Sequence, residues 1–270
     1  MAESVDTAPS AAEEERTPLD RGLSAYVYGI VPEDVQVSDE ARGVGSPPAP
    51  VRLVRHGKLG ALVSEVAIDR PLGTPDDLVA HQQLLDATAA EVPVLPLRFG
   101  AVLTNREAVV DELLAPHHDE FVAALDELEG RAEFVVKGRY DERAVLMEVL
   151  TENVEAAQLR DEIRGKPEAA TREARIRLGE LVNQAVSAKR EADTQAVLDR
   201  LAPISVFTVV RDPSHERDAV HLALLVENDR QGELEEAVEE YSRLWEGRIE
   251  LELHGPLAPY DFVVSGGEGG

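Results

Sequence analysis

The chain has 270 residues, no cysteine, and 53 acidic against 27 basic residues, which gives a formal charge of −26 at pH 7. The absence of cysteine excludes disulfides, thiolate nucleophiles and cysteine-ligated metals, and the large negative charge argues against nucleic acid as a partner. The length predicts two domains, each able to bury its own core, and only 4% of the residues are aromatic, so these cores must be mainly aliphatic.

The two ends of the chain are predicted to be disordered. Residues 1–22 form an acidic tail with almost no large apolar side chain, and residues 265–270 are rich in glycine. No apolar run approaches the roughly 20 residues that span a bilayer, and the first residues do not resemble a signal peptide. We therefore expect a cytoplasmic protein with no membrane partner.

The first half of the chain predicts an N-terminal α/β domain over residues 23–130. Its predicted elements, in chain order, are a strand over 24–31, a hairpin of strands over 51–55 and 59–66, a helix over 75–91, a strand over 92–99, and helices over 105–114 and 116–130. Thr74 and Pro75 supply the cap and first turn of the first helix. Pro96 places the strand that contains it at a sheet edge or a bulge.

The second half predicts a ferredoxin-like domain over residues 131–264. Its predicted elements are a strand over 133–140, a helix from about 141, strands over 204–211 and 219–227, a helix over 231–245, and a strand over 248–254. This β-α-β-β-α-β order is typical of a four-stranded antiparallel sheet with helices on one face. The predicted fold class is therefore α+β, with two domains.

The first helical connection of this second domain, about residues 151–202, is longer than a compact crossover needs. After a turn at 165–167, the proline-free run over 168–201 could form a helix on the order of 50 Å long, so part of it should project. Small residues at helical spacing form a stripe of Leu181, Ala185, Ala188, Ala192 and Ala196. The stripe suits either a self-packed helical hairpin or a docking site for a partner helix.

Few residues suggest chemistry. Arg98 lies in an apolar strand, where a buried guanidinium must find a carboxylate, carbonyls or water, so we expect it to clamp the sheet to neighbouring helices. His81 is expected to be a hydrogen-bonded structural histidine that could face Arg98 or a carboxylate. Residues 117–120, His-His-Asp-Glu, are interpreted as a solvated helix, because adjacent helical residues point about 100° apart. No phosphate loop, dinucleotide fingerprint or hydrolase elbow occurs in the sequence.

Three segments in order resemble the gas vesicle protein L/F family (GvpL/GvpF). They are Tyr-Val-Tyr-Gly-Ile-Val at 26–31, His81 ahead of Val-Leu-Pro-Leu-Arg-Phe-Gly at 94–100, and Gly-Pro-Leu-Ala-Pro-Tyr-Asp-Phe at 255–262. The positions that match the family motifs, expected to be structural or interaction residues, are Tyr28, Gly29, His81, Pro96, Arg98, Phe99, Gly100, Gly255, Pro256, Pro259, Tyr260 and Phe262. The chain departs from the family pattern in its acidic N-terminal extension and at Leu257 and Ala258, which replace a tryptophan and a proline.

The resemblance implies a non-enzymatic accessory protein of gas vesicle formation, cytoplasmic and associated with the vesicle. It implies binding to the major shell protein and other accessory gas vesicle proteins during nucleation or assembly, with no cofactor, catalytic residue or metal. An acidic partner could shield the apolar shell subunit through a sheet edge or groove.

Two other classes of function stay open at this point. One is a small-ligand-sensing module in which Arg98 holds a carboxylate or phosphate, and the other is an enzyme that uses His81 and Arg98. The sequence also leaves open the oligomeric state and the choice between an L-type and an F-type role.

Overall fold

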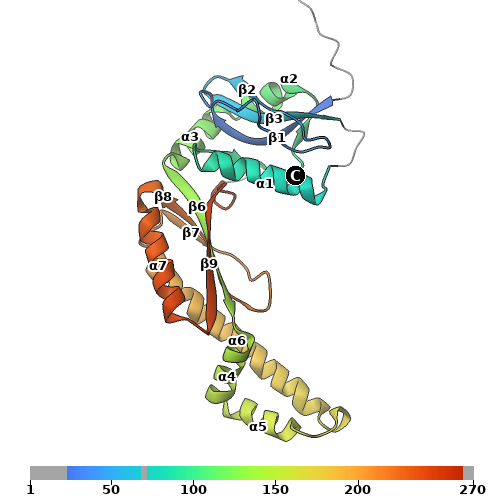
Figure 1. The fold of residues 1–270 in the computed structure, drawn as a ribbon, viewed down its shortest axis with the longest axis vertical. Coiled ribbons are helices and arrows are strands. Elements are labelled where there is room, and N and C mark those ends of the chain that lie inside the picture. Colours follow the sequence, from blue (N-terminus) through green and yellow to red (C-terminus); the bar gives the residue numbers. More distant parts are fainter. Residues whose placement is uncertain (1–22, 68–71, 264–270) are drawn as a thin grey trace, which may run out of the picture.

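Two antiparallel sheets lie one beyond the other along a long molecule, which narrows into a helical extension at its far end (Figure 1). This computed structural model describes residues 23–67 and 72–263, and seven α-helices accompany the sheets within those ranges. The tails predicted over 1–22 and 265–270 lie outside the described residues.

The N-terminal sheet has the strand order β2-β3-β1-β4, and β5 also pairs with β1. Its strands are β1 (Leu23–Pro32), β2 (Val51–His56), β3 (Leu59–Ala67), β4 (Leu95–Pro96) and β5 (Val102–Leu103). The predicted hairpin of β2 and β3 is confirmed. All strand pairings among its described residues are antiparallel, because α1 (Pro75–Ala89) carries the chain from β3 past β1 to β4 and so places β1 between these two parallel strands; the predicted α/β character of this part is therefore corrected to α+β.

The predicted strand over 92–99 is wrong in extent. Leu95 and Pro96 pair with β1 at the sheet edge, as Pro96 suggested, and Leu97 N–H adds one hydrogen bond to Tyr28 O at 2.8 Å. The chain then leaves the sheet in a tight turn, closed by a hydrogen bond from Ala101 N–H to Arg98 O of 3.3 Å.

The first two helices of this half begin where they were predicted, at residues 75 and 105–106, whereas the third begins at His118 rather than at 116 and has no side-chain cap. They are α1 (Pro75–Ala89), α2 (Arg106–Ala108) continued by a π-helical turn over Val109–Leu114, and α3 (His118–Leu128). Thr74 accepts from Asp77 N–H while the Asp77 side chain reaches back to the cap, which makes a complete capping box. Asn105 caps α2 by accepting from Ala108 N–H at 2.8 Å. In Figure 1, α1 lies along the underside of the sheet, between it and the C-terminal half.

The C-terminal sheet has the strand order β7-β8-β6-β9. Its elements are β6 (Arg131–Tyr140), α4 (Glu142–Glu152), β7 (Phe207–Val210), β8 (Asp218–Glu227), α7 (Gln231–Leu244) and β9 (Ile249–Leu257). They follow the predicted β-α-β-β-α-β order. The core between the sheet and the helices α6 (Arg172–Leu201) and α7 includes Phe134, Leu201, Leu222 and Leu234, all of them buried.

The helical extension projects beyond the sheet, as predicted (Figure 1). It consists of α4, α5 (Val154–Ile163), a 3-10 turn over Glu168–Ala170, and α6 (Arg172–Leu201). The helices α5 and α6 pack against each other, with Ala156 fully buried. The predicted stripe is only partly realised, because Ala188 and Ala192 are exposed, whereas α6 buries Val197 and Leu201 against the sheet.

The two halves differ in how their cores are built. Among the described residues, the C-terminal core contains only residues of the C-terminal half. On one face of the N-terminal sheet, however, the core also takes in Leu225, Phe262 and Val263, and on the other face it takes in Ala258 and Tyr260. The core of the N-terminal half is therefore completed by residues from the end of the chain and by Leu225 of the C-terminal sheet.

Candidate functional site

The three family-like segments meet at His81, on α1. Its Nδ1 lies 2.8 Å from the Tyr26 hydroxyl, and its Nε2 lies 2.9 Å from the Tyr260 hydroxyl and 3.2 Å from Leu97 O. The ring of Phe99 packs edge-on against the imidazole. In this cluster, here called the His81 node, His81 is only 3% exposed and Tyr26 is 0% exposed, whereas Phe99 and Tyr260 are half-buried, so the imidazole itself is shielded from solvent.

The hydrogen bonds of the His81 node fix where its protons lie. Leu97 O can only accept, so in the neutral imidazole Nε2 carries the proton and Nδ1 accepts from the Tyr26 hydroxyl, which itself accepts from Gly100 N–H at 3.2 Å. Nε2 then carries the imidazole proton toward Tyr260 and Leu97 O, and the Tyr260 hydroxyl donates to Leu97 O at 3.3 Å. Every polar atom is satisfied while the imidazole is neutral.

Burial disfavours the charged forms of the three titratable side chains of the node, His81, Tyr26 and Tyr260. It lowers the pKa of His81, an effect that the hydrogen bond to Leu97 O only partly opposes. Burial also raises the pKa of Tyr26, and it raises the pKa of Tyr260 to about 12 with help from the nearby Asp86 charge. The node is thus a neutral structural contact.

A second set of polar contacts attaches the loop before β2 to the same helix and strand. The Tyr28 hydroxyl donates to Ser64 Oγ at 2.9 Å and accepts from Val44 N–H at 2.8 Å. Asp77 accepts from Gly45 N–H at 2.8 Å. Burial alone would raise the pKa of Asp77, but this bond and those at the helix cap outweigh it and hold the pKa below its ordinary value.

The end of the chain, residues 255–263, here called the crossing segment, runs from the C-terminal sheet onto the N-terminal half. Gly255 opens this crossing with φ at 149°, and a Cβ there would overlap Phe134 and come within 3.0 Å of Glu133 O, so the turn requires glycine. Ala258 N–H then donates to the Asp86 carboxylate of α1 at 2.9 Å. Tyr260 enters the His81 node, and Phe262 packs into the core beneath β1.

A charged cluster holds the same crossing segment to the C-terminal sheet. Arg211 binds both Glu133 and Asp261, with 2.9 Å between its Nη2 and Glu133 Oε1. Asp261 N–H also donates to Glu133 Oε2 at 3.2 Å. Burial and the neighbouring Asp261 carboxyl raise the pKa of Glu133, which is 1% exposed. This cluster is a structural junction between the two sheets.

Arg98 lies away from both clusters, and the clamp predicted for it is wrong. Its side chain is exposed, and its guanidinium makes no hydrogen bond or ion pair within the described ranges. The reason is that β4 ends at Pro96 and the chain turns outward, so Arg98 is not part of a buried strand. His81 and Arg98 consequently do not form a shared site.

The other histidines do not assemble a metal site. His117 contacts Glu120 at 3.2 Å and His118 contacts Asp119 at 2.9 Å, both at the start of α3. Within the described ranges, no three His, Asp or Glu side chains gather closely enough to hold a metal ion. No helix there is long and apolar enough to cross a membrane.

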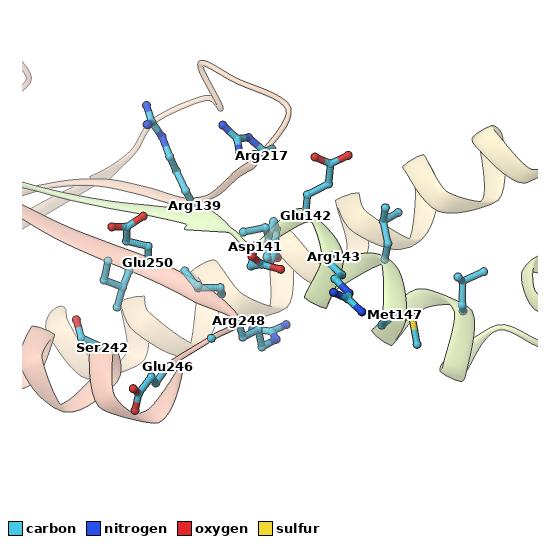
Figure 2. Close-up of a pocket in the computed structure, with 16 residues that line it drawn as sticks. Arg139, Asp141, Glu142, Arg143, Met147, Arg217, Ser242, Glu246, Arg248 and Glu250 are labelled. Carbon is cyan, nitrogen blue, oxygen red and sulfur yellow. The ribbon is translucent and has the colours of Figure 1, made fainter.

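A wide recess of about 1040 Å³ lies where the C-terminal sheet meets α4 (Figure 2). In Figure 2, Arg139 and Arg217 extend to the same side of it as Glu142. Arg248, at its base, is already bound by Asp193 with two contacts of 2.9 and 2.8 Å. Because charges of both signs are interspersed around the recess, its electrostatics favour no single class of ligand.

The sequence pointed to several residues of the His81 node but not to their meeting. Tyr28, Gly29 and Pro96 lie beside the node on β1 and β4, and Pro256 and Pro259 lie in the crossing segment. The Arg211 cluster gave no sequence signal, because acidic side chains are so numerous that no pair stands out. Only knowledge that Asp261 packs beside Glu133 could have identified it.

The chain is similar to known proteins along nearly its whole length. The sequence pattern of the family described as "Gas vesicle synthesis protein GvpL/GvpF" matches residues 24–264. Gas vesicle protein F of Streptomyces sp. (strain CB03234) is 36% identical over 245 residues, covering 89% of this chain and 100% of that protein. Gas vesicle protein L of the same strain is 30% identical over 267 residues, covering 88% of this chain and 92% of that protein.

The fold is similar to solved structures as well. The crystal structure of the gas vesicle protein GvpF from Anabaena sp. PCC7120 superposes with a TM-score of 0.73 at 26% identity, covering 89% of this chain and 98% of that one. GvpF from Microcystis aeruginosa gives a TM-score of 0.72 at 23% identity. The matched region contains the His81 node, the crossing segment and the helical extension.

Proposed function

The chain belongs to the GvpL/GvpF family of gas vesicle synthesis proteins, and on this basis we propose that it is a non-enzymatic accessory protein of gas vesicle assembly. In this role it binds the major shell protein and other accessory gas vesicle proteins during nucleation and early growth. We place it in the cytoplasm, at the growing vesicle.

The observation that carries this proposal is the burial of the His81 node. Of the family-motif side chains that could take part in proton transfer, His81 and Tyr28 are buried and Tyr260 is half-buried, and the polar atoms of all three are already satisfied by protein groups. A catalytic group must reach its substrate, so these positions suit architecture better than chemistry. Function then depends on exposed surfaces that meet other proteins.

We divide the family-motif positions by their exposure. The buried ones, such as Gly29 and Pro96, are proposed to hold the fold, whereas Arg98, which is exposed and has no partner among the described residues, is proposed to contact a partner protein. We likewise propose that residues 23–130 and 131–264 act as two domains, joined by the crossing segment.

The charge of the chain suits a soluble carrier of an apolar subunit. A molecule with a net charge of −26 repels its own kind, so a complex of it with an apolar shell subunit would resist uncontrolled association. At the same time, partner binding must use the limited apolar surface that the chain exposes.

Two experiments test the proposal. First, the full chain is mixed with the purified major shell protein, and we expect stable co-purification. Second, a gas vesicle gene cluster that lacks this gene should regain vesicles when the parent gene is returned. The Arg98→Ala variant should fold normally yet restore fewer vesicles. Absence of shell-protein binding, together with vesicle formation without the gene, would contradict the proposal.

A further inference from the structure

The outer edge of the C-terminal sheet is unusually open at β7. This strand has β8 as its neighbour on one side and no strand on the other among the described residues. Its sequence, Phe-Thr-Val-Val, contains no charge and no proline, and Phe207 and Val210 are 57% and 55% exposed. Sheet edges normally carry charged residues or proline that prevent pairing with other chains.

The opposite edge of the same sheet shows the usual protection. Strand β9 carries exposed Glu250, Glu252 and His254 along its length. The contrast within one sheet indicates that the β7 edge is suited to pairing rather than protected against it.

The backbone of β7 has hydrogen-bonding groups free for such pairing. Arg211 N–H donates to His221 O of β8 at 2.9 Å. Because donors alternate along an antiparallel strand, the N–H groups of Val210 and Thr208 point away from β8. A strand added at the usual distance of about 4.8 Å from β7 could accept hydrogen bonds from these N–H groups.

An apolar groove lies beside this edge, on the face to which Phe207 belongs. It has a volume of about 330 Å³, and its walls come from α3, β8 and the crossing segment, through Phe121, Ala124, Leu128, Leu225 and Phe262 together with Phe207 itself. Alternate side chains of a strand paired with β7 would project on this face and enter the groove. The β7 edge and the groove together are called the edge groove.

The rim of the edge groove is acidic. Glu120 and Glu127, both exposed, line it from α3. The Glu127 carboxylate has no ion pair within the described ranges, and Glu120 meets only His117, which is charged only when protonated. An occupant with a lysine or arginine beside its apolar residues would therefore be favoured over a neutral or acidic one.

We propose that the edge groove binds an extended segment of the gas vesicle shell subunit by β-strand addition, with aliphatic side chains at alternate positions and a basic residue beside Glu127. This inference rests on the proposed function, which supplies the apolar partner. A second copy of this chain fits less well, because each copy carries a charge of −26 and the same acidic rim.

The test measures binding of the full-length chain to the purified shell subunit. Phe207→Lys places a charge at the groove, and Val210→Pro removes an outward N–H without breaking a bond to β8. Each should weaken binding about tenfold or more. Leu244→Lys is the matched control, since Leu244 on α7 is 71% exposed and the charge change is the same. This control should bind like the parent, and all three variants should keep the parent's melting temperature.

Two further measurements separate the possible outcomes. Glu127→Gln should weaken binding a few-fold and reduce its sensitivity to salt. The amides of Thr208 and Val210 should gain protection from hydrogen exchange in the complex. If the parent binds the shell subunit and both β7 variants bind equally well, the inference is wrong while the proposed function stands. If the parent fails to bind at all, both are overturned, and a dimer that Phe207→Lys dissociates would make a second copy the occupant.

Discussion

The hydrogen bonds of the His81 node predict that its two tyrosine hydroxyls contribute unequally to the stability of the protein. Tyr26→Phe removes the donor to His81 Nδ1, and Tyr260→Phe removes a group on the Nε2 side. Both substitutions keep the aromatic ring, so each probes a single hydroxyl. We expect Tyr26→Phe to destabilise the protein clearly more than Tyr260→Phe does.

The magnitudes follow from the partners that each substitution leaves behind. Without the Tyr26 hydroxyl, His81 Nδ1 has no other donor in contact and stays buried, at a cost of about 1–3 kcal/mol on top of the lost bond. The other group released, Gly100 N–H, lies in an exposed turn and can be hydrated. Without the Tyr260 hydroxyl, His81 Nε2–H still has Leu97 O at 3.2 Å, so the cost should be about 1 kcal/mol or less.

Urea unfolding of the two variants and the parent at pH 7.5 measures this difference, through the midpoint at a shared m-value. A third variant, Tyr241→Phe, serves as a control, because its hydroxyl donates to a single backbone oxygen, Ala196 O, at 2.8 Å on α6. Equal costs for Tyr26→Phe and Tyr260→Phe, or a larger cost for Tyr260→Phe, would refute the proton arrangement derived for the node.

Three further predictions test other parts of the structure. Because burial lowers the pKa of His81, the unfolded chain binds a proton at this side chain below about pH 6.5, whereas the folded chain does not. The free energy of unfolding should therefore fall by up to about 1.4 kcal/mol per pH unit on acidification. Urea titrations of the parent and of His81→Gln at pH 5 to 7.5 should show this pH dependence as a difference between the two proteins. Arg98→Leu should change the free energy of unfolding by no more than about 0.5 kcal/mol, since the side chain is exposed and unpaired, and a large loss of stability would restore the clamp. Gly43→Ala should destabilise by about 3 kcal/mol or more, because its Cβ would overlap the buried Tyr28 hydroxyl, and a melting curve like that of the parent would contradict this packing.

Local chemistry made much of the fold predictable. Thr74 and Asn105 mark helix starts by side-chain capping, and the structure contains both caps. The hairpin around Gly57 and the alternating elements of the second half followed from strand propensity and turn residues. These features depend on neighbours within a few residues, which is the range over which sequence patterns are informative.

The site was less predictable because its contacts join distant parts of the chain. His81 and Tyr260 are 179 positions apart, and Glu133 and Asp261 are 128 apart. The prediction that Arg98 is a buried clamp failed for a related reason. An apolar run around an arginine has the same pattern whether the chain continues as a buried strand or turns out of the sheet. The burial of a segment depends on the residues that pack against it, and the pattern within the segment does not identify those residues.

The crossing segment explains why family-like residues occur near both ends of the chain. The N-terminal sheet is built mainly from the first half of the sequence. The cores on its two faces nevertheless include Ala258, Tyr260 and Phe262 from the end of the chain. Apolar burial by these residues and the contact to His81 therefore couple the stability of the N-terminal half to the completed C-terminal sheet. A partner that binds at the edge groove, whose wall includes Phe262, would act on this same coupling. Docking of an apolar segment there would stabilise the junction between the two halves as well as cover the segment.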